Sequence, residues 1–398
     1  LVFFLAKIWD AFTDPIMGYI ADNTSTRWGK FRPYILFGSV PALIMIILCF
    51  TSPDLSQTGK FYWALFTYIT FTTLYTIIAI PVGSLIPAMT QDRDERTSLA
   101  SFRYLGASSG SIAVAVLTLP LVGLFSSPQF GFPIVVGCLA VLGAIFAFLC
   151  FFNTKEVYSK PYEETIGIKK VTKMVFNNYP LHFVILALLT TWVANNIKQL
   201  TVVYFVKYNL QLEAYFSPIL LGVILQIMFG AYLVNLIKHR FEKKTLFMIG
   251  TFLYVITDLI IYYITGYENF WLLAFIATFG FIGFGMAGVM AWSMIADTIE
   301  YGEWKSGFRA EGVLNAAHVF VFKLSVGFSA WLAGVILEST DYVANAIDQS
   351  PETLNGLFIM GYIFPAVAGT IAIIVTYFNK YDSNFYERIF SELKQRQS

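Results

Sequence analysis

The chain has 398 residues and a formal net charge of +1; 57% of its residues are hydrophobic and only 13% are charged. Soluble proteins usually contain about 25% charged residues, so this composition excludes an ordinary soluble domain. The small net charge also excludes a general basic surface for nucleic acid. Three cysteines, Cys49, Cys138 and Cys150, lie in apolar segments without metal or redox spacing. We therefore expect an all-α membrane protein.

Apolar stretches of about 20 residues predict eleven membrane helices. In chain order, they are 1–21, 33–52, 61–87, 98–125, 132–152, 179–208, 215–237, 245–265, 270–298, 313–338 and 353–379. The polar segment 153–178 separates the first five from the last six. We expect an N-terminal helix bundle at 1–152, a central cytoplasmic loop at 153–178, a C-terminal six-helix bundle at 179–379 and a tail at 380–398.

Basic residues alternate between successive loops. The segment 153–178 carries five lysines, whereas the loops 209–214, 266–269 and 339–352 contain no lysine or arginine. By the positive-inside rule, the basic loops and the C-terminus are cytoplasmic in a multi-pass protein of the cell inner (plasma) membrane. The first span then runs inwards, and it begins with Leu in the middle of an apolar run. We therefore expect one further helix before residue 1.

The first span carries three charged residues, Lys7, Asp10 and Asp14, on one helix face. A charge at mid-membrane costs about 2.5–3.5 kcal/mol even on a lenient scale, so these side chains should face a protein interior or a watery cavity. Carboxylates and the Thr13 hydroxyl are oxygen ligands that suit a hard monovalent cation. The alternative is an internal Lys–Asp ion pair that only fixes helix packing.

The two halves of the chain resemble each other weakly. GKFRPYILFG at 29–38 is similar to EKKTLFMIG at 242–250, and the segment 84–103 is similar to 293–312. Such repeats are typical of transporters built from two bundles around a midplane site.

Three segments resemble the glycoside–pentoside–hexuronide:cation symporters. They are KIWDAFTDPIMGYIADNTSTRWGKFRP at 7–33, IPVGSLIPAMTQDRDER at 80–96 and SMIADTIEYGEWKSGFRAEG at 293–312. The resemblance implies a major facilitator fold with two six-helix bundles, working as a monomer by alternating access. It also implies uptake of a glycoside with Na⁺, H⁺ or Li⁺, and no resident cofactor.

By this resemblance, Asp10, Thr13, Asp14 and Thr76 form the cation site, with Asp10 and Asp14 as metal ligands if the ion is Na⁺. Ala79 stands where melibiose permeases have an acidic residue, and Gly83 follows where they have an aromatic one. These differences disfavour galactoside recognition. They leave Na⁺ and H⁺ open, because a proton needs only one carboxylate.

Further polar residues within the predicted helices are candidates for sugar binding. Sugars need convergent hydrogen bonds from charged or amide groups, with aromatic rings against their C–H faces. The candidates are Lys7, Tyr75, Arg103, Asn195, Asn196 and Lys323, of which Tyr75, Arg103 and Lys323 match residues of the family. The two asparagines could equally be interhelical packing contacts. Together with Lys198, the basic residues favour a glucuronide or pentoside over a neutral galactoside, and Asp258 is expected to be structural.

Charged residues at the predicted cytoplasmic ends are candidates for gating. In the wider fold, such residues hold the inward-closed state through ion pairs and helix-end contacts. They are Asp22, Arg27, Asp297, Glu300 and Arg309. The alternative is a solvated loop that only determines topology.

The sequence contains no nucleophile arrangement, metal-ligand histidine spacing or Walker A motif. We therefore expect neither an enzyme nor ATP-driven transport. The expected partners are a sugar or glycoside, a monovalent cation and the lipid bilayer. A lysolipid symporter of the same fold is the main alternative, and a receptor or scaffold without cation flux is a third.

Overall fold

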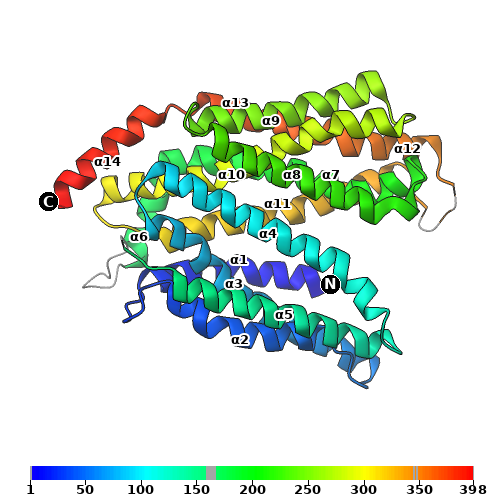
Figure 1. Cartoon of the computed structure of the whole chain (residues 1–398), viewed down its shortest axis with the longest axis horizontal. Helices are drawn as coiled ribbons and strands as arrows, with labels where there is room; N and C mark the ends of the chain where they lie inside the picture. The colour runs from blue at the N-terminus through cyan, green and yellow to red at the C-terminus, as the bar shows by residue number, and fades with distance from the viewer. Residues whose placement is uncertain (1, 158–166, 344–345, 347, 398) are drawn as a thin grey trace. The chain divides into compact units, whose positions relative to one another are not determined.

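The computed structural model describes residues 2–157, 167–343, 346 and 348–397, and this part of the chain contains helices and no strands (Figure 1). The elements are α1 (Val2–Asp22), α2 (Arg32–Cys49), α3 (Gln57–Met89), α4 (Arg93–Val122), α5 (Pro128–Asn153), α6 (Ile168–Phe176), α7 (Tyr179–Tyr204), η1 (Phe205–Asn209), η2 (Glu213–Tyr215), α8 (Phe216–Ile237), α9 (Lys243–Ile260), η3 (Ile261–Thr265), α10 (Phe270–Ser306), α11 (Glu311–Ser339), α12 (Pro351–Phe358), η4 (Ile359–Ile363), α13 (Phe364–Phe378) and α14 (Ser383–Gln397). The predicted all-α architecture is confirmed.

Every predicted span coincides with helix in the structure. Three spans contain a π-helical turn: η1 continues α7, η3 continues α9, and η4 joins α12 to α13. Ten helical stretches of the described chain are long and apolar enough to cross a membrane. The first helix, α1, is not among these ten; its sequence includes Lys7, Asp10 and Asp14.

Three helical features were not predicted. A short helix, α6, lies within the predicted loop 153–178, where Val171 and Met174 are buried between lysines. The C-terminal tail also contains a helix, α14, which buries Ile389 and Leu393. In addition, α10 extends to Ser306 instead of ending near 298. Hydropathy marks only the apolar part of a helix, so amphipathic helices and charged helix ends escape it.

The chain divides into two compact units. One contains Leu1–Arg96, Ser109–Asn177 and Gly302–Phe320; the other contains Thr97–Ser108, Asn178–Tyr301 and Val321–Ser398. In the first unit, α2 packs against α3 and α5, and α1 packs against α3. In the second unit, α13 packs against α7 and α9. The first turns of α11 therefore belong with the N-terminal helices.

Each unit has its own apolar core. In the first, Met17 and Ala21 of α1 pack with Ile35, Leu85 and other buried residues. In the second, the core is centred on α7, with Val193, Ala194 and Ile197.

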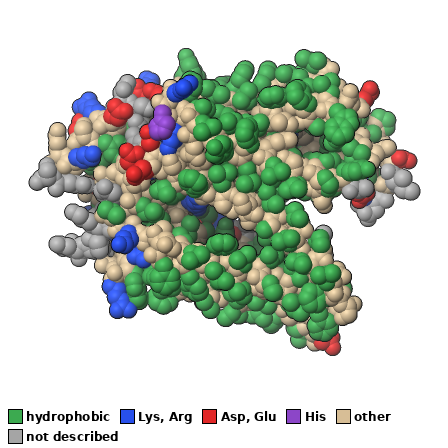
Figure 2. Space-filling model, in the orientation of Figure 1, with side chains coloured by type: hydrophobic (Ala, Val, Ile, Leu, Met, Phe, Trp, Pro, Cys, Tyr) green, Lys and Arg blue, Asp and Glu red, His purple; other side chains and the backbone are tan. Residues whose placement is uncertain are grey.

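The outer helix faces expose large apolar side chains. Phe66 is 64% exposed, Phe146 61% and Trp271 80%, and hydrophobic side chains cover much of the visible flank of the helices (Figure 2). So much exposed apolar surface fits a lipid environment rather than water. This is the surface of a multi-pass membrane protein.

Candidate cation, substrate and gating sites

A buried acid pair lies on α1, against α3. The side chains of Asp10 and Asp14 are 1% and 0% exposed. The Thr76 hydroxyl of α3 donates a hydrogen bond of 2.9 Å to Asp14 Oδ1. A second side-chain bond joins the same helices, from Trp9 Nε1 to Thr73 Oγ1 at 2.8 Å. The two helices are thus fixed to each other around two intramembrane carboxylates.

The structure brings together only part of the predicted cation and substrate set of the first unit. Thr13 directs its hydroxyl to its own helix, at 3.3 Å from the Trp9 carbonyl oxygen and 3.4 Å from that of Asp10. Tyr75, next to the buried Thr76, is 55% exposed. The Lys7 side chain, and with it the predicted Lys7–Asp10 pair, lies outside the described residues.

Gly83 of α3 stands where melibiose permeases have an aromatic residue, and the structure gives a steric reason for the glycine. A Cβ atom at this position would lie 2.1 Å from Nδ2 of Asn315 on α11. That nitrogen donates a hydrogen bond of 2.8 Å to the Ile80 carbonyl oxygen of α3. The amide of α11 therefore occupies the space that a larger residue at position 83 would need.

In the second unit, Arg103 and Trp292 face each other. The Arg103 guanidinium carbon lies 4.0 Å from the centre of the Trp292 ring, a cation–π contact between α4 and α10. Hydrogen bonds attach this part of α4 to its neighbours: Thr97 to Ser293 of α10 at 3.0 Å, and Ser101 to the Ala231 carbonyl oxygen of α8 at 2.8 Å. The contact thus places a planar donor group beside an aromatic face.

The remaining substrate candidates lie on α7 and α11. Asn195 is buried, at 4% exposure. Asn196 Nδ2 donates to Ser325 Oγ at 2.9 Å, an interhelical contact of the packing kind. Lys323 is half-buried on α11, two residues before Ser325.

Lys198 lies in a different environment from the one predicted. Its ammonium group forms an ion pair with Asp258 of α9, and both side chains are largely buried. The interruption of two apolar helices by opposite charges was a visible signal, but only the fold reveals that they meet. A paired lysine has no surplus charge to attract an anionic sugar.

The gating candidates of the first unit meet around the start of α11. Asp22, at the end of α1, accepts hydrogen bonds from the backbone N–H groups of Gly312 at 2.7 Å and Val313 at 2.8 Å. The carboxylate therefore caps α11 and lies at the positive end of its dipole.

Close backbone approach makes the Asp22 cap possible. A Cβ on Gly18 would lie 2.6 Å from the Gly312 carbonyl oxygen, and a Cβ on Gly312 would lie 2.5 Å from that of Gly18. Only residues without a side chain permit this contact between α1 and α11.

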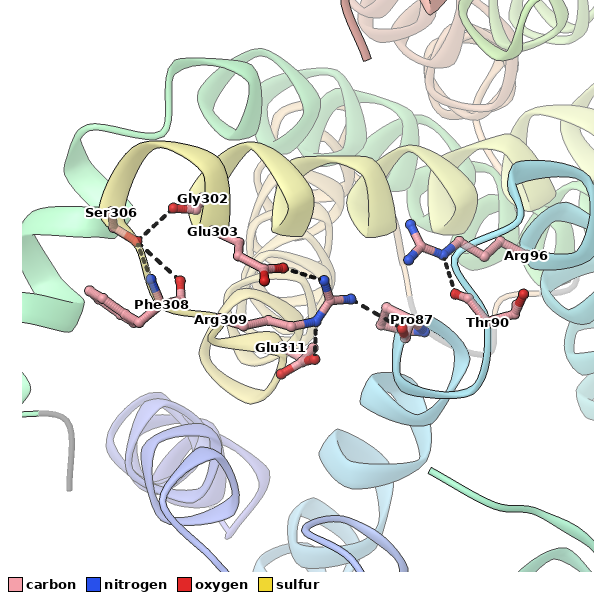
Figure 3. A network of polar contacts seen from close by, with 9 residues as sticks. All are labelled: Pro87, Thr90, Arg96, Gly302, Glu303, Ser306, Phe308, Arg309 and Glu311. Carbon is pink, nitrogen blue, oxygen red and sulfur yellow. Dashed lines mark hydrogen bonds and ion pairs between the residues drawn. The ribbon is translucent and has the colours of Figure 1, made fainter. Parts of the chain in front are cut away.

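Arg309 connects the turn between α10 and α11 to α3 (Figure 3). Its guanidinium pairs with Glu303 at 2.6 Å and with Glu311, and donates at 3.1 Å to the Pro87 carbonyl oxygen. The two ion pairs hold the turn to the end of α10 and the start of α11, and the hydrogen bond to Pro87 fixes it against the end of α3.

Other gating candidates have different surroundings. Arg27 is exposed and stacks on Trp28, with its guanidinium carbon 4.2 Å from the ring centre, so the structure does not bring it to Asp22. In the second unit, Asp297 pairs with Lys243 of α9 at 2.8 Å, and Glu300 is fully buried.

A residue that the sequence did not indicate completes this end of the first unit. Glu156, from the predicted central loop, accepts hydrogen bonds from the backbone N–H groups of Lys30, Phe31 and Arg32 at 2.8, 2.9 and 3.0 Å. It supplies the cap that α2 lacks, because Phe31 at the N-cap position has no capping side chain. One sign in the sequence indicated that another residue must cap this helix: no Ser, Thr or Asp stands at its N-cap position.

Comparison with known proteins agrees with this architecture. The model of a family described as MFS/sugar transport protein matches residues 1–383. The uncharacterized symporter YjmB of Bacillus subtilis (strain 168) is 34% identical, covering 99% of this chain and 86% of that protein. The isoprimeverose transporter of Lactiplantibacillus pentosus is 32% identical, covering 99% of this chain and 83% of its own.

A solved structure supports the fold independently. The proton:xylose symporter XylE bound to 6-bromo-6-deoxy-D-glucose matches with a TM-score of 0.65 at 13% identity, over 93% of this chain and 83% of that one. The chain therefore belongs to the MFS/sugar transport protein family, within the glycoside:cation symporters, and is a membrane transporter rather than an enzyme.

Proposed function

We propose that the protein takes up a glycoside together with a monovalent cation, Na⁺ or H⁺, by alternating access. The observation that carries the proposal is the acid pair of α1, with Asp14 bonded to Thr76 and Asp10 buried four residues earlier. Two carboxylates within a membrane helix are costly unless a proton, a metal ion or a cationic side chain compensates them. A coupling ion supplies that compensation reversibly.

The second unit supports the sugar half of the proposal. Arg103 and Trp292 offer a charged donor group and an aromatic face within one contact. Hydroxyl-rich ligands are held by such combinations, with hydrogen bonds to the hydroxyls and ring packing against the C–H faces. Lys323 would add a second positive charge. The names of the isoprimeverose transporter and the xylose symporter point the same way.

For the substrate class, we favour a glucuronide or pentoside over a neutral α-galactoside. Arg103 and Lys323 can recognise a carboxylate or a dense set of hydroxyls. Two positions that galactoside carriers fill with larger side chains are Ala79 and Gly83 here, and Asn315 occupies the space next to Gly83. Lys198 no longer supports an anionic sugar, because Asp258 neutralises it.

The test is uptake into proteoliposomes with a panel of glucuronides, xylosides, melibiose and lysophospholipids. Inward gradients of Na⁺ and of protons are imposed separately, and liposomes containing Asp14→Asn protein serve as the control. We expect one glycoside class to accumulate under one of the two gradients only with wild-type protein. Accumulation of lysophospholipid alone, or uptake that ignores both gradients, would overturn the proposal.

A further inference from the structure

An ion pair is buried inside the second unit, separate from the acid pair of α1. Lys198 of α7 contacts Asp258 Oδ1 of α9, and the two side chains are 11% and 1% exposed. The second carboxylate oxygen, Oδ2, is buried and has no hydrogen-bond partner among the described residues. The site is built around the carboxylate and is not completely satisfied by the lysine.

Aromatic rings surround the ammonium group on its other sides. Lys198 Nζ lies 4.6 Å from the ring centre of Tyr254, 5.0 Å from that of Tyr362 and 5.2 Å from that of Phe281. One carboxylate and three rings are the surroundings that proteins use to bind small organic cations. The rings come from α9, η4 and α10, so the site is assembled from several helices.

Two of the rings around Lys198, those of Tyr254 and Tyr362, are held in place by contacts with neighbouring residues. The Tyr254 hydroxyl donates to the Ala194 carbonyl oxygen at 3.4 Å. Tyr362 packs edge-on against Phe205 and Phe358, with ring centres 5.5 and 5.1 Å apart. Phe205 begins η1 and Tyr362 lies in η4. π-helical turns are frequent at functional sites, where they re-aim side chains.

We propose that Asp258, Tyr254, Phe281 and Tyr362 form a second cation site, which the ammonium group of Lys198 permanently fills. The protein thus carries a tethered cation in its second unit. The emptied site would take a small monovalent cation that donates hydrogen bonds, such as methylammonium.

The alternative role for Lys198 is to bind an anionic substrate. The contacts disfavour it, because an anion on Lys198 would have to displace Asp258. The carboxylate would then remain in an aromatic, water-poor environment without a counter-charge. Because the Lys198–Asp258 pair is neutral, it does not compete with the acid pair of α1 for a mobile coupling ion, a consequence that rests on the proposed function.

The first test empties the site. Lys198→Ala should lower the melting temperature in detergent, and methylammonium chloride should restore it saturably. At ten times its dissociation constant, methylammonium should shift the folding equilibrium about tenfold. Lys207→Ala is the matched control, because this lysine follows on η1 but pairs at 3.8 Å with Glu213 while 38% exposed. Sodium chloride at equal ionic strength controls for screening.

Two outcomes of this test would overturn the proposal. One is a folded Lys198→Ala protein whose melting temperature does not respond to methylammonium. The other is an equal response in the double variant Lys198→Ala/Asp258→Asn, which lacks the carboxylate.

A second test uses the wild-type protein and does not depend on the folding of any variant. Reductive methylation followed by mass spectrometry reports which lysines are accessible. Lys207 should react quickly and Lys198 slowly, with or without Na⁺ and with or without a glycoside. If Lys198 reacts as fast as Lys207 in any of these conditions, the ammonium group leaves the site and the proposal fails. Neither test measures transport, so the proposed function stands or falls separately.

Discussion

At the scale of single residues, the environment of Asp14 differs from that of an ordinary structural carboxylate. It is fully buried, and its Oδ1 accepts one hydrogen bond from a neutral hydroxyl, that of Thr76. Burial inside a membrane helix penalises a negative charge. Under the proposed function, a proton or a metal ion offsets that penalty at Asp14.

Removing the charge of either aspartate should uncouple sugar binding from the cation. In Asp14→Asn the amide keeps the shape but loses the charge, so some ligand binding should remain while cation enhancement disappears. Coupling free energies are reciprocal and usually about 1–3 kcal/mol, so the lost enhancement should be about 5–150-fold. The same is expected of Asp10→Asn. Sugar affinity measured by calorimetry, with and without Na⁺ and across pH, decides the matter. If both variants keep wild-type enhancement at every pH, the site is not on α1.

Loss of the Thr76 hydroxyl should weaken cation binding less than loss of the charge of Asp10 or Asp14. It should weaken it more than loss of the Thr73 hydroxyl. Thr76→Val removes the 2.9 Å hydrogen bond to Asp14 and should weaken cation affinity by about 1.5–3 kcal/mol, the usual value of a bond to a charged group. Thr73→Val is the matched control, because it removes the bond to Trp9 on the same pair of helices. Cation titration of sugar binding should separate the two. Equal effects would mean that both threonines only hold α1 against α3.

At the scale of elements, the sequence predicted the helices better than their contacts. All eleven predicted spans coincide with helices of the described chain, ten of which are long and apolar enough to cross a membrane, because a long apolar stretch has few other structures there. By contrast, α6 was missed because its two buried residues alternate with lysines over only nine residues. Length and polarity made it resemble a loop.

The sequence alone did not predict which residues of distant helices contact each other. Lys198 and Asp258 are 60 residues apart, and Glu156 caps a helix that begins at Arg32. Lys198 and Asp258 were visible as charges within apolar helices, whereas nothing singled out Glu156, and the local pattern does not indicate which groups meet. The Arg103–Trp292 contact is a partial exception, because the family resemblance pointed to Arg103, although not to the ring that it contacts.

The close approach of α1 and α11 should make Gly312 intolerant of even one methyl group. Gly312→Ala places a Cβ 2.5 Å from the Gly18 carbonyl oxygen, so the helices must separate. We expect a loss of about 1–3 kcal/mol, as for other overpacked contacts. Gly334→Ala is the control on the same helix, since a Cβ there meets nothing within 4 Å. That variant should be neutral or more stable by up to about 1 kcal/mol, the helix propensity difference. Thermal unfolding in detergent measures both, and equal melting temperatures would contradict the packing argument.

At the scale of the whole molecule, residues from both halves of the sequence form one closed polar cluster in the first unit. The segment Gly302–Phe320, which holds the end of α10 and the start of α11, belongs to the unit that contains α1, α2 and α3. Asp22 and Arg309 join these elements through hydrogen bonds to backbone groups, beside an apolar contact in which Ala316 packs with Met17 and Ala21. Hydrogen bonds to helix ends are directional, and they are lost together when the elements move apart. We propose that this contact forms and breaks during the transport cycle.

A covalent bond across this joint should therefore stop transport. A Cβ on Gly18 would lie 2.8 Å from Cβ of Ala316, about 1 Å short of the 3.8 Å typical of a disulfide, and 2.6 Å from the Gly312 carbonyl oxygen, so Gly18→Cys requires α1 to move away from α11. The reduced double variant must therefore be folded and must transport before its oxidised form is compared with it. In a background with Cys49, Cys138 and Cys150 replaced by serine, we expect oxidised Gly18→Cys/Ala316→Cys protein to bind sugar but not to complete uptake. Reduction should restore uptake, and each single variant should be insensitive to oxidant. If the cross-linked protein transports at the rate of the reduced one, α1 and α11 stay together throughout the cycle, and the moving joint lies elsewhere.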